Sequence, residues 1–240
     1  MIIDFHSHIL PGVDDGSPSL DISLAMLQAM ARQGITHVVA TPHFYPRYDH
    51  PRDFLERRNQ AEALLRAAMC HQEGLPELLV GAEVGFFRGI SQSDFLPELT
   101  IRGTHSILIE MPPAPWPEEF YRELQEIWTR WNIMPIIAHI DRYMGSFRTY
   151  GIPKRLAEMP VYVQANAEFF LERHSEKMAF RMLKADQIHL LGSDCHNLSD
   201  RKPNMGAALR KIRHQLGVEA MERIRGYGLE ALGSDEEIKG

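Results

Sequence analysis

The chain opens with the stretch IIDFHSHILPGVDDG (residues 2–16), which joins a short apolar run directly to two histidines and a pair of aspartates. The run over residues 2–5 predicts a buried β-strand, and His6 and His8 stand where that strand should end. A single His-x-His pair is a weak sign of metal binding. Its meaning depends on which residues end the other strands.

Six further apolar, β-branched runs predict strands, over residues 37–40, 78–82, 107–109, 134–138, 161–165 and 190–192. Segments with helical periodicity lie between most of them, and the clearest has Leu20, Leu24, Leu27 and Ala31 on one face. The other predicted helices cover residues 53–73, 118–131, 152–158, 175–184 and 205–216. Such alternation predicts an α/β fold with parallel strands, as an open doubly wound sheet or as a barrel.

No linker-like stretch interrupts this alternation. The 240 residues therefore predict a single domain, because α/β barrels commonly reach this length. Residues 233–240 are polar and are expected to form a frayed tail.

The ends of the predicted strands carry the chemistry. Six of the seven strands are followed by histidine, aspartate or glutamate. In a barrel the carboxyl ends of the strands meet at one face, so these side chains should lie close together although nearly 190 positions separate the first from the last. The candidate ligands found at the strand ends are His6, His8, His43, Glu83, Glu110, His139, Asp194 and His196.

Imidazole and carboxylate ligands without thiolate suit Mn²⁺, Fe²⁺ or Zn²⁺. These candidate ligands are more than a single ion can bind, and two or three ions are therefore expected. A carboxylate such as Glu83 or Asp194 would bridge neighbouring ions, which would make a hydroxide from shared water near neutral pH.

Composition excludes several other kinds of protein. A net charge of −6 argues against nucleic-acid binding. No run of residues is long and apolar enough to be inserted in a membrane, and no signal peptide is recognisable. The two cysteines, Cys70 and Cys195, give no disulfide framework, which suits a reducing cytoplasm.

Several motifs together resemble the polymerase and histidinol phosphatase (PHP) superfamily. They are His6-x-His8, Thr41-Pro42-His43, Glu83, Ile109-Glu110, His139 and Ser193-Asp194-Cys195-His196. The stretches 8–16 and 139–143, with His196-Asn197 followed by Arg201, are similar to the manganese-dependent protein tyrosine phosphatases of bacterial capsule and exopolysaccharide operons. The resemblance covers nearly the whole chain.

This resemblance implies a distorted (β/α)7 barrel with three metal ions, Mn²⁺ above all. The implied substrate is phosphotyrosine on the tail of a partner tyrosine kinase that regulates polysaccharide synthesis. Asp15 is favoured over Asp14 as a further metal ligand. Arg142 and Arg201 match the family's phosphate-binding arginines, and guanidinium groups suit phosphate oxygens.

The expected reaction is one-step attack on phosphorus by a metal-bridging hydroxide. Asp15, His43 or a metal-bound water would protonate the tyrosinate that leaves. Phe44, Tyr45 and Tyr48 are candidates to hold the substrate's aromatic ring. The sequence does not indicate the oligomeric state.

Cys195 and Arg201 have the Cys-x5-Arg spacing of thiol-based tyrosine phosphatases. We interpret this spacing as coincidental, because Asp200 would repel phosphate and Asp194 and His196 flank the sulfur as metal ligands. The alternatives are a small-molecule PHP phosphatase of the histidinol-phosphate type, a metal-dependent amidohydrolase, and a metal-stabilised binding module without turnover.

Overall fold

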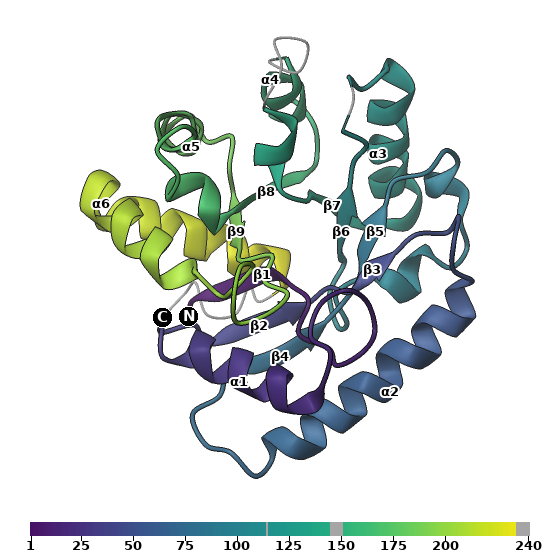
Figure 1. Cartoon of the computed structure of the whole chain (residues 1–240). Helices are drawn as coiled ribbons and strands as arrows, with labels where there is room; N and C mark the ends of the chain where they lie inside the picture. Colours follow the sequence, from purple (N-terminus) through teal and green to yellow (C-terminus); the bar gives the residue numbers. More distant parts are fainter. Residues whose placement is uncertain (114, 145–150, 234–240) are drawn as a thin grey trace.

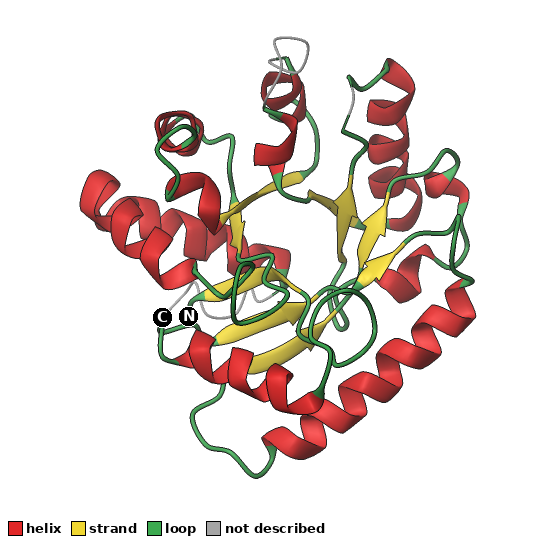
Figure 2. Cartoon of the chain, viewed as in Figure 1, coloured by secondary structure: helices red, strands yellow, loops and turns green. Residues whose placement is uncertain are grey.

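The computed structural model describes residues 1–113, 115–144 and 151–233. Figures 1 and 2 show the strands gathered around a centre, with the helices outside them. Strand pairing within the described residues is parallel. The strands are β1 (Ile3–Ser7), β2 (His37–Ala40), β3 (His43–Phe44), β4 (Glu77–Val80), β5 (Glu83–Gly85), β6 (Ser106–Glu110), β7 (Met134–Ile137), β8 (Tyr162–Asn166) and β9 (Leu190–Gly192).

The helices follow the predicted order. They are α1 (Leu20–Ala31), α2 (Pro51–Met69), α3 (Glu118–Trp131), α4 (Ile152–Leu156), α5 (Glu176–Lys184) and α6 (Met205–Ala231), with short 3-10 turns η1 (Ile90–Gln92), η2 (Leu96–Leu99), η3 (Ile140–Tyr143) and η5 (Ala167–Phe170). The predicted helix over residues 205–216 forms the first part of α6, and the sequence did not predict the part that follows. The chain bends at Gly217, where φ is 79°, and the helix then continues to Ala231.

Two of the seven predicted strands belong to longer strands that are interrupted. Residues 41–42 separate β2 from β3, and residues 81–82 separate β4 from β5. The order β1-β2-β4 makes one sheet and β3-β5-β6-β7-β8-β9 makes the other. Each interrupted strand therefore begins in the first sheet and ends in the second, and His43 and Glu83 begin β3 and β5 rather than following a strand.

The two sheets also meet between β1 and β9. Ser7 forms a parallel bridge with Cys195, the amide of His8 donates to the Cys195 carbonyl at 2.9 Å, and the amide of Asp194 donates to the His6 carbonyl at 2.8 Å. The strands thus form a strongly curled parallel sheet, in which the first strand, β1, lies beside the last strand, β9.

Alternate residues of the same strands enter two apolar clusters, as the pleat of a strand requires. Val38, Ile107 and Ile137 belong to the larger cluster, which includes helix residues such as Leu27 and Leu124. Val39, Leu108 and Ile136 belong to a smaller cluster with Ala231 at the end of α6. Apolar packing therefore covers both faces of the sheet, while the polar side chains gather at its carboxyl end.

Two sequence predictions concern the limits of the fold. The predicted tail over residues 233–240 lies outside the described residues except for Gly233. Among the described helices, none combines the length and apolar character that crossing a bilayer would demand.

Candidate metal centre

The first group of side chains comes from β1 and from the segment after β9. His6 is the fourth residue of β1, and His8 follows its last residue. Their Nε2 atoms are 3.1 Å apart, and both lie 3.1–3.5 Å from carboxylate oxygens of Glu83 and Asp194. All four side chains are buried. Two imidazole nitrogens and two carboxylates thus converge on one small volume.

Glu83 also belongs to a second group. Its Oε1 atom is 2.8 Å from Nε2 of His139, which follows β7, and the same nitrogen is 3.5 Å from Oε1 of Glu110 at the end of β6. Its Oε2 atom is 3.0 Å from Nδ1 of His43. Oε2 is buried and accepts no hydrogen bond. A buried carboxylate oxygen without a donor is costly, and a cation would satisfy it.

The third group contains Asp15, His43 and His196. Oδ1 of Asp15 lies 3.6 Å from Nε2 of His43 and 3.5 Å from Nε2 of His196. The His196 nitrogen is buried and has no hydrogen-bond partner. Potential ligand atoms of these residues and His8 lie within 4.8 Å of one another. Nε2 of His196 is therefore a second buried atom without a hydrogen-bond partner, and a cation would satisfy it.

The two aspartates that the sequence left open have different surroundings. Oδ2 of Asp14 is 2.7 Å from Nδ1 of His8 and accepts the backbone amide of His43 at 2.9 Å. Asp15 instead faces the ring nitrogens of His43 and His196. Asp14 therefore supports His8 from behind, as carboxylates commonly support metal-bound histidines.

The electrostatics of the cluster show strong mutual stabilisation. Burial alone would raise the pKa of Glu83, but the charge on His6 and the hydrogen bond with His139 hold it well below its usual range. The pKa of Asp194 is also low, because His6 and His8 outweigh its burial. Burial would lower the pKa of His139, yet hydrogen bonds with Glu110 and Glu83 raise it to about 9. Anionic carboxylates are thus favoured here.

Arg142 and Arg201 stand at the rim of this cluster. Arg142 donates to Oδ2 of Asp194 at 2.5 Å, and Arg201 donates to Oδ1 of the same residue at 2.9 Å. Their side chains are 40% and 37% exposed. Both guanidinium groups therefore reach the cluster while keeping part of their surface in solvent.

The three candidate aromatic residues lie in very different places. Phe44 is fully buried and packs against Phe54 and Phe95, so its assignment to substrate binding was wrong. Tyr45 stacks on His43 and donates to Oε2 of Glu110 at 2.5 Å. Tyr48 is 78% exposed and lines a cavity of about 450 Å³ together with Asp15 and His43.

Cys195 is unsuited to nucleophilic catalysis. The residue is fully buried, and burial together with the charge on Asp4 raises the pKa of its thiol well above its usual range. A thiol attacks as the thiolate. The amide of Arg201 is bonded to the Asn197 side chain, and the amide of His196 to the carbonyl of Arg201, so neither is free to receive phosphate.

Sequence reasoning missed two residues that touch the cluster. Gln164 and Asn166 lie on β8, the strand without a metal-ligand residue, and their side chains are buried against His6 and Asp194. Two amides at alternate positions of an apolar buried strand were the available signal, because a buried polar group needs a partner.

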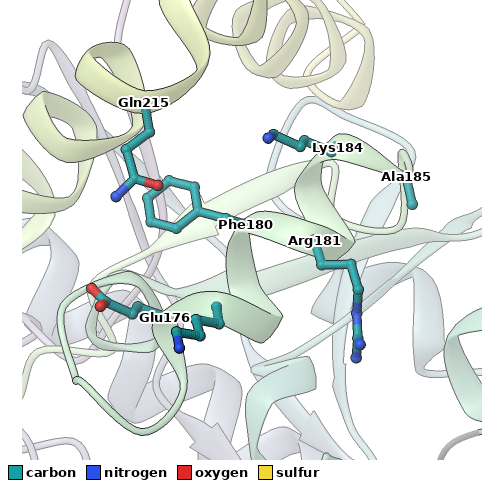
Figure 3. Close-up of a pocket in the computed structure, with 7 residues that line it drawn as sticks. Glu176, Phe180, Arg181, Lys184, Ala185 and Gln215 are labelled. Atoms are coloured by element: carbon teal, nitrogen blue, oxygen red, sulfur yellow. The ribbon is translucent and has the colours of Figure 1, made fainter.

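A separate hollow lies on the outer surface between α5 and α6, with a volume of about 710 Å³. Figure 3 shows Phe180, Arg181 and Lys184 of α5 on one side and Gln215 of α6 on the other. None of the residues that line it belongs to the cluster at the carboxyl ends of the strands.

The donor set fits divalent transition ions. It consists of imidazole nitrogens and carboxylate oxygens, it contains no sulfur, and three subsets have their ligand atoms within 4.8 Å. The fold and this cluster define a class of protein: an α/β protein whose curled parallel sheet carries a candidate multinuclear metal centre at the carboxyl ends of its strands.

The chain belongs to the family described as capsular polysaccharide synthesis, CpsB/CapC, which matches residues 2–228. The tyrosine-protein phosphatase CpsB of Streptococcus pneumoniae is 29% identical over 235 residues, covering 93% of this chain and 94% of that protein. The tyrosine-protein phosphatase YwqE of Bacillus subtilis strain 168 is 27% identical over 226 residues, covering 91% and 86%. The resemblance to capsule-operon phosphatases found in the sequence is confirmed.

A solved structure from work on YwqE of Bacillus subtilis and CpsB of Streptococcus pneumoniae, described as unique metal-dependent tyrosine phosphatases, has the same fold. Its TM-score is 0.84 at 24% identity, with 97% of this chain and 95% of that chain covered. The α/β fold with a curled parallel sheet is therefore confirmed.

Proposed function

We propose that this chain is a metal-dependent protein-tyrosine phosphatase that acts on the phosphorylated tail of a tyrosine kinase controlling capsule or exopolysaccharide synthesis in the cytoplasm. The observation that carries the proposal is the convergence of buried imidazoles and carboxylates beside two half-exposed arginines. Family membership and the names of the relatives support the choice of phosphotyrosine. We also propose a single domain, counted as a distorted (β/α)7 barrel in which β2 with β3, and β4 with β5, are interrupted strands.

Three subsites divide the proposed ligands. His6, His8 and Asp194 would hold one ion, Glu110 and His139 a second, and Asp15, His43 and His196 a third, with Glu83 between the first two. Mn²⁺ suits this mixed nitrogen and oxygen set, and Fe²⁺ and Zn²⁺ share the same ligand preferences. When bound, such ions activate water as a nucleophile and neutralise charge on the phosphoryl group.

The protein's own groups would orient the phosphoryl group and its leaving group. Arg142 and Arg201 contact Asp194 and are partly exposed, which supports a role in which their remaining N–H groups would hold phosphoryl oxygens. Asp15 and His43 line the cavity beside the cluster, where whichever of them is not bound to an ion, or a water that they hold, would hand a proton to the departing tyrosinate. Tyr48 stands at the same cavity and would contact the substrate's ring.

The test is Mn²⁺-dependent dephosphorylation of a phosphotyrosyl peptide by the wild type, Cys195→Ser and His43→Ala. We expect Cys195→Ser to stay active and His43→Ala to lose roughly 100-fold or more of the rate. An inactive Cys195→Ser protein with full metal content would overturn the mechanism. Faster hydrolysis of histidinol phosphate than of the peptide would instead indicate a small-molecule phosphatase.

A further inference from the structure

Strand β8 contributes two buried amide side chains to the metal centre. Gln164 and Asn166 are two positions apart, so both side chains leave the same face of the strand. Gln164 is 0% exposed and Asn166 is 7% exposed. Each of the amide groups has to find its partners inside the protein.

The partners form a continuous chain of hydrogen bonds. Oε1 of Gln164 accepts the backbone amide of His139 at 2.6 Å and lies 3.3 Å from Nδ1 of His6. Nε2 of Gln164 donates to Oδ1 of Asn166 at 3.0 Å, and Nδ2 of Asn166 donates to Oδ2 of Asp194 at 3.1 Å. Proposed ligands on β1 and in the segments after β7 and β9 are therefore joined through one strand.

The direction of every bond in this chain follows from one backbone group. The amide of His139 is only a donor, so the Gln164 atom that faces it must be the carbonyl oxygen. That oxygen has no proton to give, so Nδ1 of His6 must donate to it. His6 then carries its proton on Nδ1 and presents the lone pair of Nε2 to the metal centre.

The other end of Gln164 has an equally fixed role. Its NH₂ group is only a donor, so Asn166 must face it with oxygen and turn its own NH₂ group to Asp194. This bond engages Oδ2 of Asp194, while Oδ1 is the atom near the rings of His6 and His8. This series of hydrogen bonds through Gln164 and Asn166, which we call the relay, thus assigns different roles to the two oxygens of the Asp194 carboxylate.

The packing around the relay leaves no spare room. A Cβ atom added to Gly192, at the end of β9, would lie 2.5 Å from Cβ of His6 and 2.8 Å from Nε2 of Gln164. Contacts this short are not tolerated without a shift of the neighbours. Glycine at this position therefore lets β9 approach closely enough for the amide chain to form.

We propose that Gln164 is a positioning residue, which fixes the tautomer of His6 and, through Asn166, the orientation of the Asp194 carboxylate. Supporting groups of this kind typically change metal affinity 10–100-fold when they are removed. The inference rests on the proposed metal centre. The added point is that β8, which carries no proposed metal ligand, sets the geometry of His6 and Asp194 on other segments.

The test compares Gln164→Met, which removes both the acceptor and the donor, with Gln164→Glu, which keeps the acceptor. Metal-free protein is titrated with Mn²⁺ by calorimetry. In parallel, histidine-labelled protein loaded with diamagnetic Zn²⁺ is used to follow the Nδ1 proton of His6 by NMR. We expect Gln164→Met to weaken the tightest Mn²⁺ step 10–100-fold and to lose the downfield Nδ1 proton signal, and Gln164→Glu to keep that signal.

Gln33→Met is a matched control, because Gln33 also makes three hydrogen bonds, to Ala29, Pro203 and Gly206. It should lower the melting temperature without changing Mn²⁺ affinity. Unchanged affinity in Gln164→Met, an equal loss in Gln33→Met, or an Nε2–H tautomer of His6 in the metal-free wild type at neutral pH would overturn the positioning role. A wild type that binds no Mn²⁺ would instead refute the metal centre itself.

Discussion

Glu83 is the residue that joins the groups of the candidate metal centre. Nitrogens of four histidines lie within 3.3 Å of its two oxygens, and its Oε2 atom accepts no hydrogen bond. Without an ion, the raised pKa values of His8 and His139 favour protons on these two rings beside the carboxylate. With an ion, they must give them up, because only the neutral ring coordinates a metal.

His139 predicts how the stability of the metal-free protein depends on pH. Its pKa is raised from 6.5 to about 9, because its hydrogen bonds with Glu110 and Glu83 outweigh its burial. Its contribution to stability is therefore complete below pH 6.5 and is lost as the pH rises toward 9. Urea denaturation of metal-free protein should show the free energy of unfolding falling across this window, by about 3 kcal/mol at most from this group.

Two comparisons check the origin of that slope. His139→Gln should give a shallower decline, since His8, whose pKa is also raised, remains. Added Mn²⁺ should reverse the sign, because metal binding releases protons and strengthens as the pH rises. An unchanged slope in His139→Gln would show that another group is responsible.

Among the elements, β3 explains why sequence reasoning found the histidine and misplaced its neighbour. The strand has only two residues, too few to show a period-two pattern. The sequence therefore gives no signal for a strand at these two residues. In the structure, pairing with β5 turns His43 toward the metal centre and Phe44 into the core, because successive side chains of a strand point to opposite faces.

The sequence predicted more of the arrangement of the longer strands. Their apolar runs and the residues that end them predicted that eight candidate ligands lie together at one edge of the sheet, where the structure brings them together, and the resemblance added Asp15. Gln164 and Asn166 were missed, because amides are less usual ligands of transition ions than imidazoles and carboxylates, and their role appears only through contacts with other segments. The break between β4 and β5 was also missed, since residues 81–82 continue the predicted strand over residues 78–82.

The end of β5 gives a prediction for Gly85. A Cβ atom there would lie 2.4 Å from the ring of Tyr45, which is bonded to Glu110. Gly85→Ala should displace this ring, cost roughly 1–3 kcal/mol of stability, and lower phosphatase activity by about 10-fold or more. Gly226→Ala is the control, because its Cβ meets nothing within 4 Å inside α6. It should be neutral or slightly stabilising; equal activity losses in the two variants would contradict the argument.

For the molecule as a whole, the proposed ions would hold the curled sheet closed. Ligands of the first group come from β1, β5 and the segment after β9, and this group lies beside the contact where β1 meets β9. A chelator should leave buried carboxylates without cations at this contact. At 100 times the dissociation constant, Mn²⁺ should stabilise the protein by about 2.7 kcal/mol, which raises the melting temperature by roughly 5–10 °C for a chain of this size.

Hydrogen exchange locates this stabilisation. The amides of His8 and Asp194 bond across the contact between β1 and β9, whereas the amide of Ala138 bonds to Ile109 between β6 and β7. On removal of Mn²⁺, exchange at the first two amides should accelerate more than exchange at Ala138, because the opening free energy of a local unit depends on its own contacts. Equal acceleration at all three amides would mean that the ions stabilise the fold globally. An unchanged melting temperature after complete metal removal would mean that the sheet closes on its hydrogen bonds and apolar packing alone.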